Sequence, residues 1–301
     1  MNILLAGNDK VYVGMELVVY STMSHNKNIN WFIFTMDITI TNEKTKEGKD
    51  FKGLGAWERN RLRSIVKMFD KNSDIVFIDT HDLYVQEFWN NPNEFSWLTP
   101  YAPLRLLADI ALPELNEVLY LDCDTAVDGD LSEMYYTYLD ENTNYAAYEC
   151  KAAIETDISE MISGVMLMNL KKMRETGFLE RARENVRTHV YKWYDQDAIA
   201  AAGRPEKVLP EKYSYMYEYE YLTYKPVIYH FTNKLNPKVY DLPKGRDFFY
   251  NRYPYFKYVK EGVARLDSSN FNCGYTVETE PPLIKPHIDK AHNKKEENDG
   301  V

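Results

Sequence analysis

The chain has 301 residues, of which 45% are hydrophobic, and its formal net charge is -10. This length suits one large α/β domain or two small ones, and the composition predicts a sizeable hydrophobic core. The negative charge argues against a nucleic-acid partner, because such proteins carry basic surfaces that neutralise phosphates. An anionic ligand would have to be met by local cations, helix N-termini or a bound metal.

The first 170 residues alternate between short apolar runs and helical patterns, as is typical of repeated strand-helix-strand units. The expected strands are 2–7, 29–34, 73–79 and 117–122, and the expected helices are 12–25, 56–69 and 103–112. This order predicts an α/β fold with a mostly parallel central sheet flanked by helices. In such sheets the ligand binds beyond the carboxyl ends of the strands.

The second half of the chain is less regular. Strands are expected at 145–149 and 164–170, followed by a long charged helix at 171–193 and another helix at 196–203. Alternating tyrosines between 213 and 221 would share one face of an extended segment. That segment is either a half-buried strand or loop, or an aromatic platform for a sugar or a lipid.

The cysteines and the apolar segments bear on the cellular compartment. Cys123, Cys150 and Cys273 form no CxxC pair, which argues against a disulfide framework and a zinc site and favours a cytoplasmic location. No segment approaches the roughly 18 apolar residues of a membrane span. The aromatic and basic stretch 247–260 suits either peripheral contact with the inner face of a membrane or a folded cover over the preceding domain.

Two acidic side chains follow the predicted strand 117–122. In an extended chain Asp122 and Asp124 would point the same way, about 7 Å apart. Such a pair suits a hard divalent cation that bridges to ligand phosphates, although acidic residues also commonly end strands. The stretch LDCDTAV is also similar to the first motif of haloacid-dehalogenase-type phosphatases, which usually follows the first strand of the chain rather than a later one.

Two later segments supply further polar groups. A strand-like run delivers His230 to a polar loop, where imidazole could complete the coordination of a metal held by two carboxylates, or serve only the structure. Asp195 and Gln196 stand at the start of a predicted helix. They would either cap that helix or hydrogen-bond sugar hydroxyls and support positive charge at an anomeric carbon.

Taken together and in this order, these segments resemble glycosyltransferase family 8, the retaining enzymes that include glycogenin-like and lipopolysaccharide galactosyltransferase-like proteins. The resemblance runs from Met1 to about Pro237. The stretches that carry it are NILLAGND, LRLL, VLYLDCD, SGVMLMNLKKMRE, YDQDAIA and HFTNKLNP.

The resemblance implies a GT-A fold. The catalytic domain would span 1–240, with a donor-binding half at about 1–125 and an acceptor-binding half at about 126–240. A C-terminal extension would follow at 241–301, and its polar end is expected to be disordered.

The resemblance also assigns roles to individual residues. Asp122, Asp124 and His230 would bind Mn²⁺ or Mg²⁺, and Asp195 and Gln196 would be the catalytic residues beside the donor sugar. The residues expected to contact the UDP-sugar are Ala6, Asn8, Asp9, Lys10, Arg105, Asp122, Cys123 and Lys234.

The implied activity is transfer of a hexose, galactose or glucose, from its UDP form to a saccharide or lipid-linked saccharide in bacterial capsule or lipopolysaccharide synthesis. Gln196 would be a poor nucleophile, so departure and attack on the same face of the sugar are expected, with Asp195 acting electrostatically. The sequence departs from the family pattern at Asn8-Asp9-Lys10, at Ile162 and at Asn236, which replaces the usual phosphate-binding lysine. These departures leave open a catalytically weak sugar-nucleotide-binding protein, alongside the phosphatase and a sugar-nucleotide pyrophosphorylase.

Overall fold

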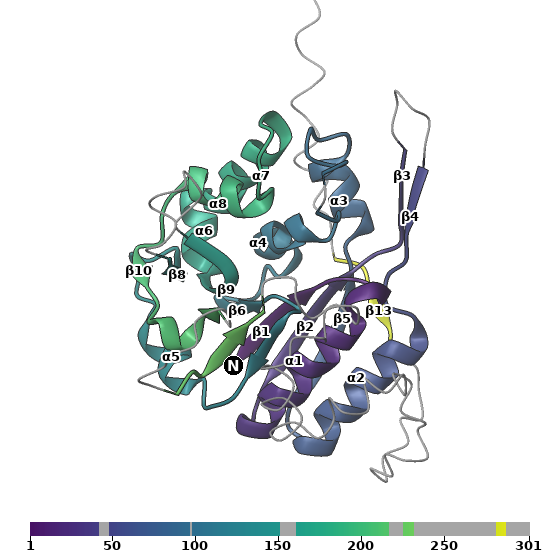
Figure 1. Ribbon diagram of the computed structural model, residues 1–301. Helices are drawn as coiled ribbons and strands as arrows, with labels where there is room; N and C mark the ends of the chain where they lie inside the picture. Colours follow the sequence, from purple (N-terminus) through teal and green to yellow (C-terminus); the bar gives the residue numbers. More distant parts are fainter. Residues whose placement is uncertain (42–47, 97, 151–160, 217–224, 232–280, 287–301) are drawn as a thin grey trace, which may run out of the picture.

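The computed structural model describes residues 1–41, 48–96, 98–150, 161–216, 225–231 and 281–286 (Figure 1). A central eight-stranded sheet has the order β10-β8-β9-β6-β1-β2-β5-β13. Its strands are β1 (Asn2–Ala6), β2 (Asn30–Thr35), β5 (Asp74–Asp79), β6 (Glu117–Leu121), β8 (Tyr145–Glu149), β9 (Met161–Asn169), β10 (Lys207–Val208) and β13 (Leu283–Ile284).

The sheet is mostly parallel, as the sequence predicts. Strands β6, β1, β2, β5 and β13 run in the same direction, whereas β9 is antiparallel to both β6 and β8. The carboxyl ends of β6, β1, β2 and β5 therefore meet at one edge of the sheet, where a ligand site is expected.

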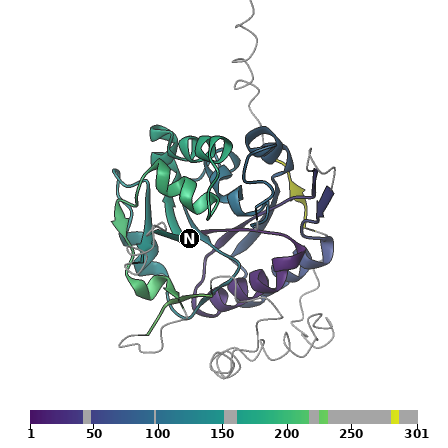
Figure 2. The ribbon, with the colours of Figure 1, turned by 45° about the horizontal axis from the view of Figure 1, so that its top comes forward.

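Two helical layers cover the two faces of this sheet. Because strand side chains alternate, Ile3 and Ile33 pack with helices α1 (Tyr12–His25) and α2 (Ala56–Phe69) on one face. Leu4 and Phe34 pack on the other face. Figure 2 shows α1 on one side of the sheet and the helices of the second layer on the opposite side.

The second layer contains most of the remaining helices. Its members are α3 (His81–Phe88), the 3-10 helix η2 (Ala102–Leu107), α4 (Ala108–Ala111), α6 (Leu170–Thr176), α7 (Phe178–Thr188) and α8 (Asp195–Ala202). Helix α5 (Ser132–Thr137) instead belongs to the core on the α1 side.

Two smaller sheets complete the described fold. In the first, β12 (Ile228–His230) lies between β11 (Tyr215–Met216) and β7 (Thr125–Val127), antiparallel to β7. The second is a hairpin of β3 (Ile38–Thr41) and β4 (Gly48–Phe51) that extends away from the central sheet (Figure 1). The hairpin and α3 were not predicted from the sequence.

The structure corrects three of the predicted elements. The long helix expected at 171–193 is divided into α6 and α7 because Gly177 adopts a left-handed conformation with φ of 64°. The helix expected at 103–112 is mainly 3-10 helix, and the strand expected at 164–170 begins earlier, at Met161.

Several other predictions lie partly or wholly outside the described residues. Tyr213 is in the 3-10 helix η4 (Glu211–Tyr213) and Tyr215 is in β11, but 217–221 is not described. Lys234, the stretch 247–260 and the polar end of the chain are also outside, and the domain limits remain predictions. Among the described residues, no helix combines the length and the apolar composition needed to cross a membrane.

Candidate active site

The three predicted metal ligands lie together at the carboxyl edge of the central sheet. Asp122, Asp124 and His230 each offer a ligand atom, and these atoms all lie within 4.8 Å of one another. His230 Nε2 is 3.6 Å from Asp122 Oδ2 and 3.4 Å from Asp124 Oδ1. Two ligands bound to one cation at about 2.1 Å each would lie roughly 3 Å apart or slightly more, so the cluster fits a divalent cation.

A turn, rather than a continued strand, brings the two carboxylates together. Strand β6 ends at Leu121, and the amide of Thr125 then donates to the carbonyl of Asp122 at 3.2 Å. The extended conformation that would separate the two residues by about 7 Å is therefore not formed. The chain resumes as β7, which pairs with β12 in a register that places Thr125 opposite His230.

Gly164 on β9 provides the space that the cluster needs. A Cβ at this position would lie 2.6 Å from Nε2 of His230 and 2.7 Å from Oδ2 of Asp122. Its carbonyl also accepts a hydrogen bond from the amide of Asp122 at 2.8 Å. A glycine is therefore required by close approach, since real Cβ atoms are essentially never found so near to other atoms.

Arg105 connects the metal cluster to the start of α8. Its guanidinium is buried, with Nη2 3.2 Å from Asp122 Oδ1 and Nε 2.7 Å from Asp195 Oδ2. Nη1 donates to the carbonyl of Ser163 at 2.6 Å, and the guanidinium carbon lies 4.1 Å from the ring centroid of Tyr120. The two ion pairs fix the carboxylates of Asp122 and Asp195 relative to each other. A direct contact between Arg105 and a donor sugar stays a prediction.

The start of α8 is held in an unusual backbone geometry. Tyr194, the residue before Asp195, has φ of 47°, a conformation that non-glycine residues rarely adopt. Its ring is fully buried, and its hydroxyl donates to Asn91 Oδ1 at 3.2 Å. Such strain persists only where the surroundings enforce it, and Tyr194 immediately precedes Asp195, the partner of Arg105.

Gln196 is tied to the same group of residues. Its Oε1 accepts hydrogen bonds from the amide of Ser163 at 3.1 Å and from the Ser163 hydroxyl at 3.3 Å. Ser163 thus contacts both Arg105 and Gln196, which places the two predicted catalytic residues beside the metal cluster.

The electrostatics of the site follow from its burial and its opposite charges. Burial opposes protonation of His230, but Asp124 and Asp122 outweigh this effect and raise its pKa to about 10. Burial also disfavours ionised Asp122, yet Arg105 and His230 hold the pKa of that carboxyl well below its usual range. A cation bound between these groups would replace the imidazolium proton.

Asp195 shows the opposite balance. Burial raises the pKa of its carboxyl to about 6, because the neighbouring guanidinium of Arg105 only partly offsets the cost of burying the charge. The Asp195 carboxyl therefore changes its charge near pH 6, and protonation would remove the negative partner of Arg105.

The loop after β1 lies at the same edge of the sheet. Ala6 ends β1 and its carbonyl accepts a hydrogen bond from Cys123 Sγ at 3.3 Å, and Asn8 is buried. Asp9 and Lys10 are exposed at the start of the 3-10 helix η1 (Asp9–Val11). Ala6 thus contacts Cys123, the residue between the two acidic side chains, and the nucleotide-binding role of these residues stays a prediction.

Three residues of the site were not predicted from the sequence. The hydroxyl of Tyr120 donates to Asp122 Oδ1 at 2.7 Å, Ser163 bridges Arg105 and Gln196, and Gly164 leaves room for the metal ligands. The two-residue period of a strand indicates that Tyr120 shares a face with Asp122. The adjacent small residues Ser163 and Gly164, within an apolar run, are a second signal, because small residues in a strand often mark a place where another group approaches the backbone closely.

The comparison with protein families agrees with this geometry. The sequence model of Glycosyl transferase family 8 matches residues 2–237. Glycosyltransferase GlyD of Streptococcus pneumoniae serotype 4 is 27% identical over 182 residues, which are 60% of this chain and 19% of GlyD. The chain thus spans about a fifth of the length of that curated relative.

Solved structures show the same fold at low sequence identity. An active-site mutant of LgtC has a TM-score of 0.62 and 15% identity, over 81% of this chain and 91% of LgtC. Galactosyltransferase LgtC in complex with donor and acceptor sugar analogues has a TM-score of 0.60 and 15% identity, over 82% and 93% of the two chains. GlyE of S. pneumoniae TIGR4 has a TM-score of 0.55 and 18% identity, over 78% of this chain and 55% of GlyE.

These likenesses establish the GT-A fold, and the family match covers both the acidic turn and His230. The chain belongs to glycosyltransferase family 8.

Proposed function

We propose that the protein is a metal-dependent retaining glycosyltransferase that transfers galactose or glucose from a UDP-sugar to a saccharide hydroxyl. The observation that carries this proposal is the cluster of Asp122, Asp124 and His230 at the carboxyl edge of a GT-A sheet. A lipid-linked saccharide of bacterial capsule or lipopolysaccharide synthesis would be a suitable acceptor.

The three clustered side chains would hold the cation by two carboxylates and one imidazole. Mn²⁺ or Mg²⁺ at this place would supply Lewis-acid stabilisation of the charge on the departing diphosphate. This local neutralisation is needed because the protein has a net charge of -10. Tyr120 and Arg105 orient Asp122 for this purpose, through contacts of 2.7 Å and 3.2 Å.

Asp195 and Gln196 would act on the sugar itself. An ionised Asp195 would stabilise positive charge at the anomeric carbon electrostatically, and the amide of Gln196 would bind a sugar hydroxyl. An amide is a poor nucleophile, so departure of the diphosphate and attack of the acceptor on the same face of the sugar is the favoured route. The 2.7 Å pair between Arg105 and Asp195 supports this arrangement because it fixes the carboxylate in place.

A screen of UDP-sugars tests this proposal. The protein is incubated with Mn²⁺ and UDP-galactose, UDP-glucose or other UDP-sugars, and released UDP is measured. We expect slow hydrolysis of one preferred donor, and its loss in Asp124→Ala. Asp74→Ala is the matched control, because this exposed carboxylate lies at the amino end of β5 and the opposite edge of the sheet.

The alternative is a catalytically weak protein that binds sugar nucleotides without transferring the sugar. It is favoured by the departures at Asn8-Asp9-Lys10 and Asn236. Mn²⁺-dependent UDP binding with no hydrolysis of any UDP-sugar, and no transfer to a panel of saccharides, would support this alternative and contradict the proposed transferase. The family match and the presence of His230 beside both carboxylates favour the transferase over a phosphatase that uses Asp122 and Asp124.

A further inference from the structure

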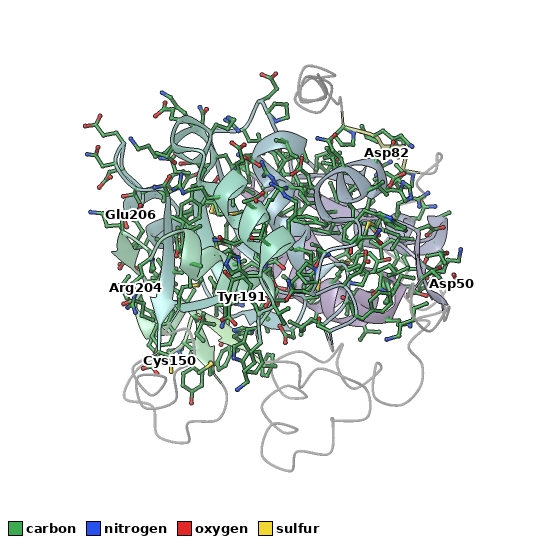
Figure 3. The ribbon with its side chains drawn as sticks, turned by 90° about the horizontal axis from the view of Figure 1, so that it is seen from above. Asp50, Asp82, Cys150, Tyr191, Arg204 and Glu206 are labelled. Atoms are coloured by element: carbon green, nitrogen blue, oxygen red, sulfur yellow. The ribbon has the colours of Figure 1, made fainter. Side chains whose placement is uncertain are left out.

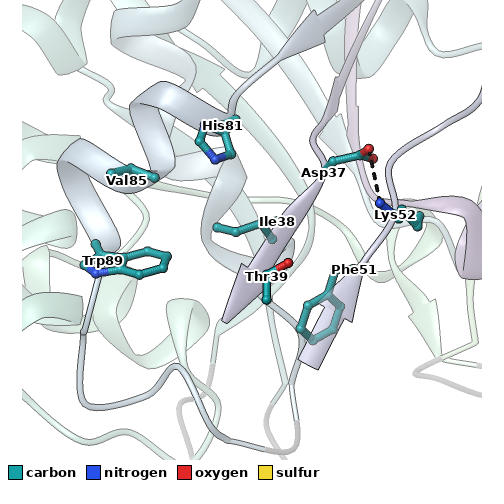
Figure 4. Close-up of a pocket in the computed structure, with 8 residues that line it drawn as sticks. All are labelled: Asp37, Ile38, Thr39, Phe51, Lys52, His81, Val85 and Trp89. Carbon is teal, nitrogen blue, oxygen red and sulfur yellow. Dashed lines mark ion pairs between the residues drawn. The ribbon is translucent and has the colours of Figure 1, made fainter. Parts of the chain in front are cut away.

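A pocket lies apart from the metal cluster, between the β3–β4 hairpin and helix α3 (Figure 4). We call it the hairpin pocket. Its volume is about 460 Å³, which is large enough for a small organic ligand. Its lining residues are Asp37, Ile38, Thr39, Phe51, Lys52, His81, Val85 and Trp89.

The helix wall of the hairpin pocket is apolar over most of its length. His81, Val85 and Trp89 are spaced four residues apart, so they lie along one face of α3 and the turn that follows it. Figure 4 shows these three side chains facing the hairpin. Val85 is 39% exposed and Trp89 is 45% exposed, so the face leaves apolar surface available to a ligand.

The hairpin wall combines an aromatic ring with polar groups. Phe51 and the buried Ile38 supply apolar surface opposite α3. Asp37 and Lys52 lie at one end of the pocket, with Lys52 Nζ 3.7 Å from Asp37 Oδ2, and both side chains are largely exposed. These two groups offer a hydrogen-bond acceptor and donors close together.

This combination of groups favours a neutral sugar over an anionic ligand. Within the lining, the charges of Asp37 and Lys52 offset each other, so this pair does not supply the excess positive charge that a phosphate or an acidic sugar would need. A sugar hydroxyl both donates and accepts hydrogen bonds, which matches the pair. The apolar face of a pyranose ring can lie against Trp89, as apolar groups commonly do on aromatic rings.

The hairpin pocket lies at the same edge of the sheet as the active site. Asp37 follows β2 and His81 follows β5, and these strands come after β6 and β1 in the sheet order. With about 5 Å between neighbouring strands, the ends of β2 and β5 lie roughly 10–15 Å from the end of β6. The amide of Asp9, in the loop after β1, donates to the carbonyl of Lys52 at 3.3 Å and links the two regions.

The hairpin and α3, which form the pocket, lie on the same side of the molecule. Figure 3 shows Asp50 of the hairpin and Asp82 of α3 on this side, whereas Cys150, Arg204 and Glu206 lie on the other. None of the residues that line the pocket belongs to the Asp122–Asp124–His230 cluster. A ligand in the pocket therefore need not displace the groups assigned to the donor.

We propose that the hairpin pocket binds a neutral sugar unit of the acceptor or product saccharide, away from the hydroxyl that reacts. The site would hold a growing chain by a unit that is not itself glycosylated, so longer acceptors would bind more tightly than short ones. That the bound sugar belongs to an acceptor rests on the proposed function. Sugar binding in the pocket is a separate property that needs neither a donor nor a metal.

Ligand binding is measured first, without UDP or metal. A panel of neutral di- to tetrasaccharides of glucose, galactose and N-acetylhexosamines is tested by saturation-transfer NMR, and dissociation constants are measured by titration calorimetry. We expect at least one member to bind, and Trp89→Ala to weaken binding about three- to tenfold, the typical value of an aromatic contact. Asp37→Asn is expected to weaken it as well.

Tyr136→Ala is the matched control, because Tyr136 is an exposed aromatic residue on α5, with 65% of its surface accessible. Binding should be unchanged in this variant. The proposal is overturned if no member of the panel binds, or if Trp89→Ala binds the saccharides as the wild type does. Circular dichroism of each variant establishes that the fold is retained.

Donor hydrolysis separates this proposal from the proposed function. Trp89→Ala should hydrolyse the UDP-sugar at the wild-type rate, while its KM for a tri- or tetrasaccharide acceptor rises about three- to tenfold and its KM for a monosaccharide acceptor does not change. Equal effects on both acceptors would contradict a remote subsite. Saccharide binding by a wild-type protein that neither hydrolyses a UDP-sugar nor transfers its sugar to any saccharide would refute the transferase and leave the binding site intact.

Discussion

Replacing Gly164 by alanine should disable the metal cluster without removing any of its ligands. The added Cβ would lie 2.6 Å from His230 Nε2 and 2.7 Å from Asp122 Oδ2, whereas ordinary contact begins at 3.4 Å. The imidazole would therefore have to retreat by at least about 0.8 Å. Metal sites tolerate only about 0.2 Å in their ligand distances, so the retreat would break the coordination.

The size of the effect follows from that displacement. His230 is only 5% exposed, so its ring has little room to move. We expect Mn²⁺ affinity to fall at least about tenfold, and donor hydrolysis to fall about a hundredfold, the usual cost of a misplacement near 1 Å. Overpacking should also lower the free energy of unfolding by about 1–3 kcal/mol.

Three measurements test this prediction. Titration calorimetry gives the Mn²⁺ affinity, released UDP gives the activity, and urea denaturation gives the stability. Gly48→Ala is the control, because a Cβ there would meet no neighbour nearer than 3.8 Å. A folded Gly164→Ala variant with wild-type affinity and activity would refute the assigned geometry of the cluster.

The remaining predictions concern the groups around the cluster. Arg105→Lys keeps the positive charge but cannot reproduce all the contacts of the guanidinium, so donor hydrolysis should fall about 10- to 100-fold. Unchanged hydrolysis would show that activity does not need Arg105 to hold the carboxylates of Asp122 and Asp195 together. Because Asp195 has a pKa of about 6 and must be ionised to act, kcat/KM should fall about tenfold for each pH unit below about 6. A pH–rate profile that is flat from pH 5 to 7 would contradict this role. Gly177→Ala should lower the free energy of unfolding by about 1 kcal/mol in urea denaturation, because alanine is strained at φ of 64°; Mn²⁺ affinity should not change.

The parts of the fold that were predictable are those whose sequence carries either a clear apolar run or a strong amphipathic period. Helices α1 and α2 have the expected limits at 12–25 and 56–69, and β1, β2, β5 and β6 lie within a residue or two of the apolar runs. The division at Gly177 was not predicted because the charged pattern continues across it, and only the backbone conformation separates α6 from α7. The hairpin lacks a long apolar run, since alternate residues of β3 face solvent.

The candidate site was predictable only in part, for a different physical reason. The identities of Asp122, Asp124 and His230 followed from residue chemistry and from the family resemblance, and the structure brings them together. Their spacing did not follow, because a turn after β6 replaces the extended chain.

The residues that support the ligands were also missed. Tyr120 acts on Asp122, two residues along the chain, so the period of the strand is the signal that could have identified it. Ser163 instead contacts Gln196, 33 residues further along the chain. That contact leaves no local pattern, so only the folded arrangement reveals it.

The central claim is that Asp122, Asp124 and His230 bind a divalent cation that in turn holds the diphosphate of the donor. Titration of UDP into the metal-free protein, with and without Mn²⁺, tests this claim most directly. We predict that Mn²⁺ strengthens UDP binding at least about tenfold, and that Asp124→Ala removes this dependence while Asp74→Ala preserves it. Equal UDP affinity with and without Mn²⁺, or an unchanged metal dependence in Asp124→Ala, would contradict it.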